Sequence, residues 1–129
     1  MKKSTIVLSV LLLLAVGYTA WRLGANSSIT GAATTESKYD AFAKCLTEKG
    51  VVMYGAYWCP HCQNQKKMFG SSWEYVDYVE CSLPNKAGQT EICKEKGIEG
   101  YPTWDIHGEF HSGELSFEKL AELTGCVLP

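Results

Sequence analysis

The chain has 129 residues, a formal net charge of −2 at pH 7 and six cysteines. A chain of this length has room for one folded domain. Its Lys and Arg residues are scattered rather than clustered, which argues against a nucleic-acid-binding protein. Six cysteines are more than a cytosolic chain of this size usually carries, and their even number favours an oxidising compartment.

The N-terminal segment has the pattern of a membrane-spanning helix. Lys2 and Lys3 precede Ile6–Val16, which is apolar except for one serine, and the whole apolar stretch is just long enough to cross a bilayer. The lysines should stay in the cytoplasm, so the rest of the chain should be exported. A cleaved signal peptide is the alternative, but the residues around the possible cleavage points suit it poorly. We expect residues 1–23 to remain as an uncleaved, single-pass anchor.

Residues 24–36 predict a flexible linker, because they are rich in small and polar residues and show no apolar period. From residue 37 to the C-terminus the sequence predicts one α/β domain. The first strand–helix–strand unit should be right-handed, with parallel strands. The expected elements are a helix at 38–48, a strand at 51–56, a helix at 60–69, a strand at 75–81, a helix at 90–96, a hairpin at 103–112 and a last helix between 116 and 125.

The chemistry is concentrated in Cys59-Pro60-His61-Cys62, directly after the first predicted strand. Pro60 falls at the first helical position, where its missing N–H costs nothing. Cys62 lies three residues after Cys59 and therefore on the same helical face. A thiolate at Cys59 would be stabilised by the unpaired N–H groups and the helix dipole, and a protonated His61 would add to this. Such a thiolate is a good leaving group, so the motif predicts a redox-active dithiol.

Half of a zinc site, or a structural disulfide, would also explain this motif. A four-ligand zinc site needs a second ligand pair at short spacing. No convincing pair exists, because Cys81 and Cys93 are not a C-x-x-C and because His107 and His111 fall on the predicted hairpin. We therefore expect no metal site and favour redox activity over both alternatives.

Aromatic residues and one proline surround this motif in the sequence or in the expected fold. Tyr101-Pro102 precedes the hairpin and suits a cis peptide bond, although sequence alone favours an ordinary trans proline at a strand start. Tyr57, Trp58 and Trp104 either form an apolar landing surface for unfolded substrates beside the dithiol or belong to the core. Sequence leaves these choices open.

These residues together resemble the thioredoxin superfamily. Cys59-Pro60-His61-Cys62 falls where that family has its C-x-x-C, and Gly100-Tyr101-Pro102-Thr103 is similar to its cis-proline loop. The resemblance implies a thioredoxin-like fold and a cis bond at Pro102. It also implies that Tyr101 and Pro102 contact the substrate backbone, and we expect Trp58 to lie beside them.

A closer resemblance is to the thioredoxin-like domains fused to, or partnered with, bacterial and plastid homologues of vitamin K epoxide reductase (VKOR). Four blocks carry it in order and spacing: 53–62, 78–81, 97–104 and 123–126. This family implies a VKOR-like integral membrane partner that passes electrons to quinone. Because the chain has no multi-helix quinone-binding domain, we expect that partner to be a separate protein of the inner or thylakoid membrane. No cofactor on this chain is implied.

The other four cysteines have no C-x-x-C spacing, and as free thiols in an exported protein they would be open to oxidation. Cys81 ends a predicted strand and Cys93 lies on the next helix, so a bridge between them closes a short loop. The remaining pair would join Cys45 to Cys126. Six cysteines allow fifteen pairings, so this connectivity is a hypothesis. We favour structural bridges that stiffen a small domain over an electron relay through Cys81 and Cys93.

The favoured function is a membrane-anchored thiol–disulfide oxidoreductase that oxidises exported proteins and is reoxidised by the quinone-linked partner. The same fold can run in the opposite direction, as a reductase or isomerase. Thioredoxins carry a buried acidic residue six positions before the first cysteine, where this chain has Met53, so the reducing role has less support. From a different class, a copper-handling module using Cys59, Cys62 and a histidine is the further alternative.

Overall fold

The computed structural model describes residues 36–129. The predicted anchor at 1–23, and the predicted linker at 24–36 except for its last residue, lie outside the described residues. Among residues 36–129, no helix combines the length and the apolar character needed to cross a membrane.

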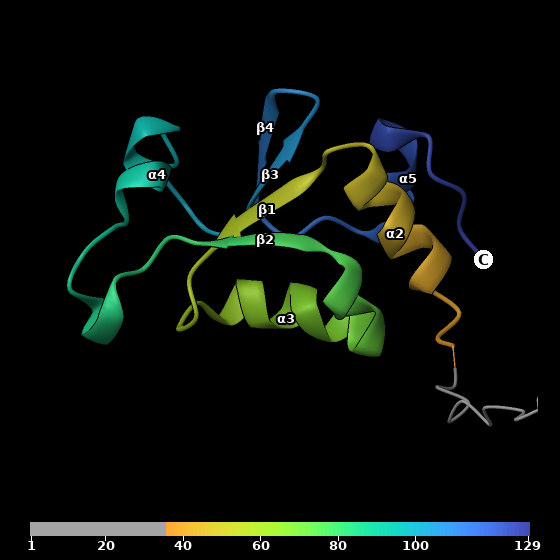
Figure 1. Cartoon of the computed structure of the whole chain (residues 1–129), viewed down its shortest axis with the longest axis horizontal. Coiled ribbons are helices and arrows are strands. Elements are labelled where there is room, and N and C mark those ends of the chain that lie inside the picture. Colours follow the sequence, from red (N-terminus) through yellow and green to blue (C-terminus); the bar gives the residue numbers. More distant parts are fainter. Residues whose placement is uncertain (1–35) are drawn as a thin grey trace, which may run out of the picture. The chain divides into compact units, whose positions relative to one another are not determined.

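A four-stranded sheet in the order β2-β1-β3-β4 forms the centre of the fold (Figure 1). β1 (Val52–Gly55) and β2 (Asp77–Glu80) are parallel and are connected through α3 (Pro60–Phe69), as the sequence predicts. β3 (Thr103–Ile106) is antiparallel to β1, and β4 (Glu109–Ser112) is antiparallel to β3. A short loop connects the end of β1 to the start of α3, so the dithiol motif lies at the C-terminal end of this inner strand.

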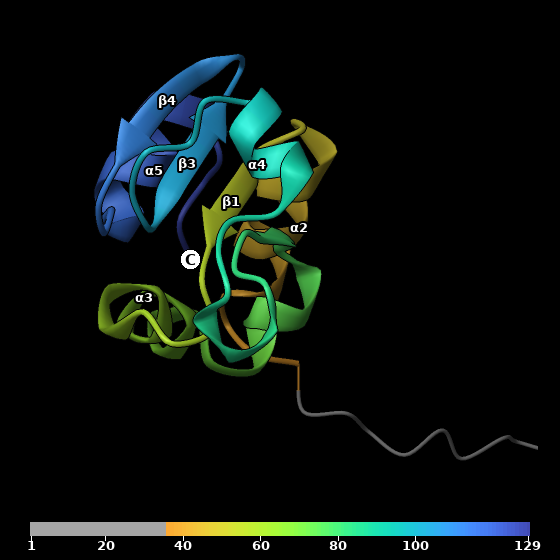
Figure 2. The same cartoon turned by 90° about the vertical axis from the view of Figure 1, so that its left-hand side faces the viewer.

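Alternation along β1 separates two apolar clusters, one on each face of the sheet. Met53 is buried in the larger cluster, to which α2 (Asp40–Glu48), α3 and α5 (Phe117–Thr124) contribute. Tyr54 lies in the smaller cluster, beside α4 (Glu91–Glu95). Figure 2 shows α5 behind the β3–β4 hairpin, on the face that the larger cluster fills.

The larger cluster is built around aromatic side chains from four elements. Phe42 of α2, Phe69 of α3 and Phe117 of α5 have ring centroids 4.8 to 6.3 Å apart. Trp104 of β3 lies 6.3 Å from Phe69 and is fully buried. Burying each such side chain contributes about 1.5–3 kcal/mol. Trp104 is therefore a core residue and not part of a substrate-landing surface.

The segment between α3 and β2 differs from the prediction. The sequence predicts a strand at 75–81, whereas Gly70–Tyr75 form a 3₁₀ helix and β2 begins at Asp77. The reason is a tertiary contact, because Ser72 Oγ donates to the buried carboxylate of Asp40 at 2.7 Å. That contact holds the segment against α2, which itself begins at Asp40 rather than at residue 38.

Two disulfides connect the helices to the rest of the domain. Cys45 of α2 is bonded to Cys126, with Cα atoms 5.9 Å apart. Cys81, directly after β2, is bonded to Cys93 of α4, with Cα atoms 5.6 Å apart. These are the two pairs expected from the sequence.

The β3–β4 hairpin has the predicted tight turn at His107-Gly108. Both residues have positive φ, 55° and 87°, as a two-residue type I′ turn requires. His111, on β4, lies 3.9 Å from a carboxylate oxygen of Glu109. In the described part of the chain, no group of three or more His, Cys, Asp or Glu side chains is placed to hold a metal ion.

Candidate active site

Cys59 and Cys62 lie where the chain leaves β1 and enters α3. Cys59 is the N-cap residue, with extended backbone (φ −77°, ψ 121°), and Pro60 occupies the first turn as predicted. Both cysteines are free thiols, whereas the four others are bonded in pairs. Cys59 is 5% exposed and Cys62 is 1% exposed. Both cysteines are therefore buried, and Cys59 is the more exposed residue of the two.

The loop that precedes β3 faces the dithiol. The Tyr101–Pro102 peptide bond is cis, as the family resemblance implied. The Cys59 thiol donates to the carbonyl oxygen of Tyr101 at 3.5 Å, and Thr103 Oγ1 donates to the carbonyl of Gly100 at 2.9 Å, which closes the loop. The Cys59 thiol therefore lies directly against the loop that contains the cis bond.

His61 is paired with a residue that the sequence analysis missed. Its Nδ1 lies 2.6 Å from Oε1 of Glu114, in the loop before α5, and the His61 side chain is 68% exposed. Exposed ion pairs of this kind contribute at most about 1 kcal/mol to the free energy of unfolding. The two residues are 53 positions apart, so no local pattern signals the contact. His61 was expected to act on the Cys59 thiolate, whereas in the structure its ring contacts the Glu114 carboxylate.

Gln65 holds the loop that carries Glu114 against α3. Its side chain is fully buried, donates to the carbonyl of Leu115 at 3.0 Å and accepts from the Leu115 N–H at 2.8 Å. The amide thereby satisfies both of its polar groups inside the fold. A glutamine within a helix gives no sequence signal of burial, so this positioning contact appears only in the folded chain.

Cys62 belongs to α3, and its side chain faces the parallel strands β1 and β2. A Cβ atom on Gly55 of β1 would lie 2.9 Å from the Cys62 sulfur and 2.9 Å from the ring of Tyr78 on β2. Burial raises the pKa of the Cys62 thiol to about 12, although a hydrogen bond with the backbone of Ala56 acts in the opposite direction. Burial also raises the pKa of the Tyr78 phenol. The reduced protein therefore keeps Cys62 protonated at neutral pH.

Exposed aromatic side chains lie beside the more accessible cysteine. Tyr57 is 46% exposed and Trp58 is 40% exposed. The Trp58 ring packs edge-to-face against Tyr101, with centroids 6.1 Å apart, and its Nε1 donates to Ser82 Oγ at 2.8 Å. The ammonium of Lys86 lies 5.5 Å from the centroid of Trp58. Trp58 is thus held beside the Tyr101 loop, while one part of its ring stays open to solvent.

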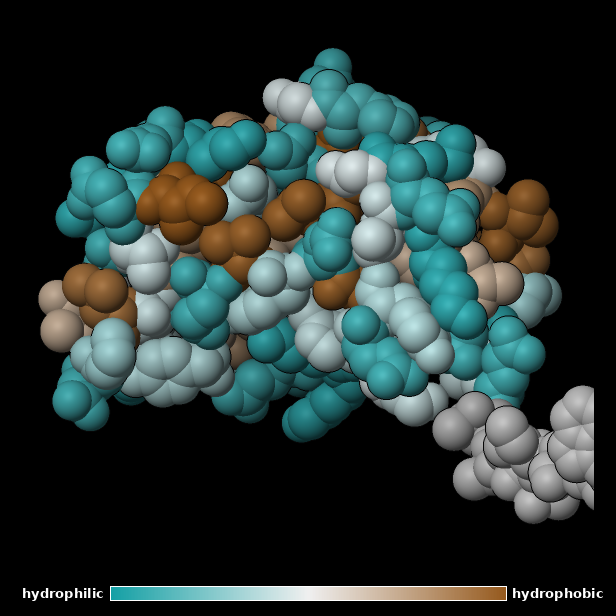
Figure 3. All heavy atoms as spheres, viewed as in Figure 1, coloured by the Kyte–Doolittle hydropathy of each residue, from teal (hydrophilic) through white to brown (hydrophobic). Residues whose placement is uncertain are grey.

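Apolar side chains also reach the surface on the α4 side of the domain. Leu83 is 38% exposed and Ile92, on α4, is 51% exposed. Figure 3 shows hydrophobic side chains at the surface in this region, separated by hydrophilic ones. The exposed apolar surface is therefore not confined to the residues around Cys59.

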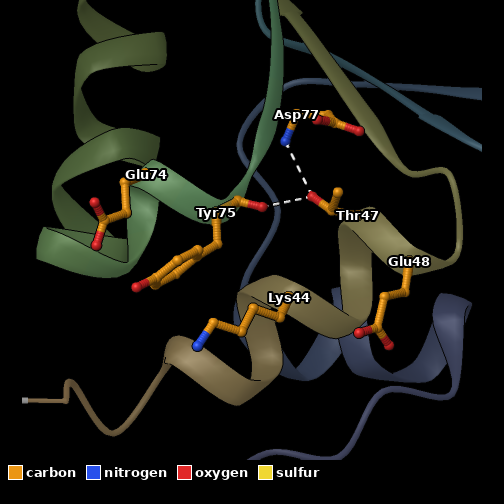
Figure 4. A pocket seen from close by; sticks show the side chains of 6 residues that line it. All are labelled: Lys44, Thr47, Glu48, Glu74, Tyr75 and Asp77. Carbon is orange, nitrogen blue, oxygen red and sulfur yellow. Dashed lines mark hydrogen bonds between the residues drawn. The ribbon is translucent and has the colours of Figure 1, made fainter.

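A depression of about 350 Å³ lies between α2 and the start of β2. Thr47 spans it, donating to the carbonyl of Tyr75 at 2.5 Å and accepting from the N–H of Asp77 at 3.3 Å (Figure 4). These bonds attach α2 to the sheet, and no lining residue belongs to the dithiol site. The lining residues are Lys44, Thr47, Glu48, Glu74, Tyr75 and Asp77.

This arrangement of a helix-capping cysteine, a buried second cysteine and a facing cis-proline loop agrees with a sequence comparison. The chain matches the thioredoxin family over residues 31–121, and it belongs to that family. A relative, thiol-disulfide oxidoreductase LTO1 of Arabidopsis thaliana, is 45% identical over 92 residues, which are 68% of this chain and 24% of LTO1. The chain thus spans about a quarter of that relative's length. Among solved structures, oxidized glutaredoxin 2 of Chlamydomonas reinhardtii shares 22% identity, with a TM-score of 0.41 over 71% of this chain and 100% of the other.

Proposed function

We propose that the protein is a membrane-tethered thiol–disulfide oxidoreductase that oxidises the thiols of exported proteins. The observation that carries this proposal is the pair of free cysteines at the start of α3, with Cys59 facing the Tyr101–Pro102 loop. Membership of the thioredoxin family and the activity named for LTO1 support the class of reaction.

The reaction begins from the Cys59–Cys62 disulfide. A substrate thiolate attacks Cys59 Sγ, the S–S bond breaks, and its electron pair goes to Cys62, which takes up a proton. A second substrate thiolate then attacks the substrate sulfur of this mixed disulfide, and Cys59 leaves as a thiolate. The N-terminus of α3 stabilises that thiolate through its unpaired N–H groups and dipole. The substrate gains a disulfide, and the protein is left with two reduced cysteines.

The surface around Cys59 binds the substrate in this proposal. An extended segment of an unfolded protein lies along Tyr101 and Pro102, and the exposed faces of Trp58 and Tyr57 contact its apolar side chains. Rigid aromatic side chains suit such a role, because they offer a large contact area and lose little conformational entropy.

We place the domain in a periplasm or thylakoid lumen, tethered by residues 1–23. Four of the six cysteines are bonded as disulfides, which supports an oxidising compartment. A VKOR-like, quinone-linked membrane protein is the proposed partner that reoxidises Cys59 and Cys62. The family resemblance supports this partner.

The reduction potential of Cys59–Cys62, measured by equilibration against glutathione, tests the direction of electron flow. A potential between about −120 and −180 mV is expected for a protein that donates disulfides. A value near about −270 mV would identify a reductant instead. The matched variants Cys59→Ala and Cys62→Ala are the controls, because neither can form the disulfide and both should abolish the measured transition.

A further inference from the structure

Cys62 must gain and lose a proton in every cycle of disulfide exchange. When the disulfide opens, the sulfur of Cys62 leaves as an anion; when the disulfide re-forms, the Cys62 thiol must lose its proton before it attacks. The side chain is only 1% exposed, so bulk water has little access to it. A proton therefore needs a route through neighbouring groups. Thioredoxins carry an acidic residue at the position of Met53, but a methionine side chain cannot accept or donate a proton.

Two polar side chains on β2 lie on the Cys62 side of the sheet. Tyr78 and Glu80 are two positions apart and therefore share a face, and Tyr78 packs against the cluster that contains Cys62. The Tyr78 hydroxyl donates to Oε2 of Glu80 at 2.8 Å. Both the Cys62 sulfur and the Tyr78 hydroxyl oxygen lie within 3.3 Å of the position that a Cβ would occupy on Gly55. The Tyr78 hydroxyl is therefore bonded to the carboxylate and lies near the thiol.

Glu80 is held in place by the backbone. Its Oε1 accepts from the N–H of Tyr57 at 3.2 Å and from the N–H of Ser82 at 2.9 Å. Tyr57 belongs to the loop that leads into the dithiol, so the carboxylate is attached to the same loop as Cys59. Glu80 is half-buried, which lets it exchange protons with solvent.

The other ionisable groups facing Cys62 come from its own helix. Cys59 raises the pKa of the Cys62 thiol, and Lys66 lowers it. The ammonium of Lys66 lies 3.6 Å from the centroid of the Tyr78 ring, so it stands over the phenol. Neither group accepts a proton here, because Lys66 is already charged and Cys59 is the sulfur that exchanges with substrate.

We propose that Glu80 exchanges a proton with Cys62 through the hydroxyl of Tyr78. When the disulfide opens, the Tyr78 O–H protonates the departing Cys62 sulfur, and Glu80 takes up a proton from solvent and passes it to the Tyr78 oxygen. When the disulfide re-forms, the proton returns along the same path while the Cys62 sulfur attacks Cys59 and expels the bound thiolate. This inference rests on the proposed exchange at Cys59 and Cys62, and it holds for either direction of electron flow.

Reaction of the reduced protein with one equivalent of 5,5′-dithiobis(2-nitrobenzoate), followed by stopped flow over a range of pH, separates the two sulfurs. Cys59 attacks first and releases one coloured thiolate. Cys62 then attacks the mixed disulfide on Cys59 and releases the second. The variant Cys62→Ala should show the first phase alone, which assigns the second phase to Cys62.

In Glu80→Gln and in Tyr78→Phe the second phase should slow roughly 100-fold at neutral pH, the size of a lost general acid–base contribution. It should approach the wild-type rate at alkaline pH, where hydroxide removes the proton, and the first phase should not change. Asp77→Asn, an exposed carboxylate on the same strand, is the matched control and should leave both phases unchanged.

A second phase of unchanged rate in either variant would overturn the relay. So would slowing by the same factor at every pH, which is what a merely structural role predicts. Tyr78→Phe keeps the test decisive if Glu80→Gln does not fold, because it removes only a hydroxyl. Absence of the second phase in the wild-type protein would instead refute the proposed exchange between Cys59 and Cys62.

Discussion

Replacing Gly55 with alanine tests the closest packing around the buried thiol. The new Cβ would lie 2.9 Å from the Cys62 sulfur and 2.9 Å from a ring carbon of Tyr78. Neither neighbour is the free end of a flexible chain, because Cys62 is fixed on α3 and the Tyr78 hydroxyl is bonded to Glu80. Overpacking of this kind costs about 1–3 kcal/mol. Alanine restricts the unfolded chain, which offsets only about 0.4–1 kcal/mol. We expect a net loss of about 1–2 kcal/mol.

Urea unfolding of the reduced protein measures this change through the midpoint, with an unchanged slope. Gly100→Ala is the matched control, because a Cβ there meets nothing within 4 Å and the backbone φ is not positive. It should be neutral, or stabilising by up to about 1 kcal/mol. If Gly55→Ala shifts the midpoint in the same direction and by the same amount as Gly100→Ala, the packing argument is wrong.

Three further predictions concern stability. The pKa of Cys62 is raised from 9.0 to about 12, so the folded state binds this proton more tightly than the unfolded state. The resulting stabilisation is complete below pH 9 and is lost as pH rises toward about 12. Unfolding of reduced and disulfide-oxidised protein against pH should therefore diverge in this window, and parallel curves would contradict it. Ser72→Ala removes the donor to the buried carboxylate at the start of α2 and should cost about 1.5–3 kcal/mol. Ser71 is the exposed neighbour of Ser72, and Ser71→Ala should lower the free energy of unfolding by less than about 0.5 kcal/mol. Equal losses in the two variants would refute the role of the bond between Ser72 and Asp40. The bridge between Cys45 and Cys126 spans a sequence separation of 81, for which the loop-entropy relation predicts about 4.5 kcal/mol. Urea unfolding of C45A/C126A checks this, and a loss below about 1 kcal/mol would show that the relation fails here.

Local signals in the sequence determined the elements whose ends they mark. The helix expected at 60–69 is α3, because Pro60 starts it and Gly70 follows its last residue. The hairpin turn is at His107-Gly108, where both residues adopt the positive φ that the turn requires. These boundaries depend on residues adjacent in the chain, so they can be predicted without knowledge of the fold.

The segment before β2 was decided by tertiary contacts. Its composition favours a strand from residue 75, but Gly70–Tyr75 form a 3₁₀ helix. Ser72 there bonds to Asp40, which is 32 positions away in sequence, and no local propensity contains that contact. Trp104 is a second case, because its aromatic ring suits a surface or a core equally and only the packing against Phe69 selects the core.

The candidate active site could likewise be predicted only in part. The dithiol was predictable because Cys59, Pro60 and Cys62 are contiguous and their spacing places both sulfurs on one helical face. The groups that surround the sulfurs were not predictable, since Glu114 meets His61 across 53 positions. Sequence by itself therefore determined where the two free thiols lie in the fold. The tertiary structure decided which groups surround them, because the packing of strands and helices sets which side chains face the thiols.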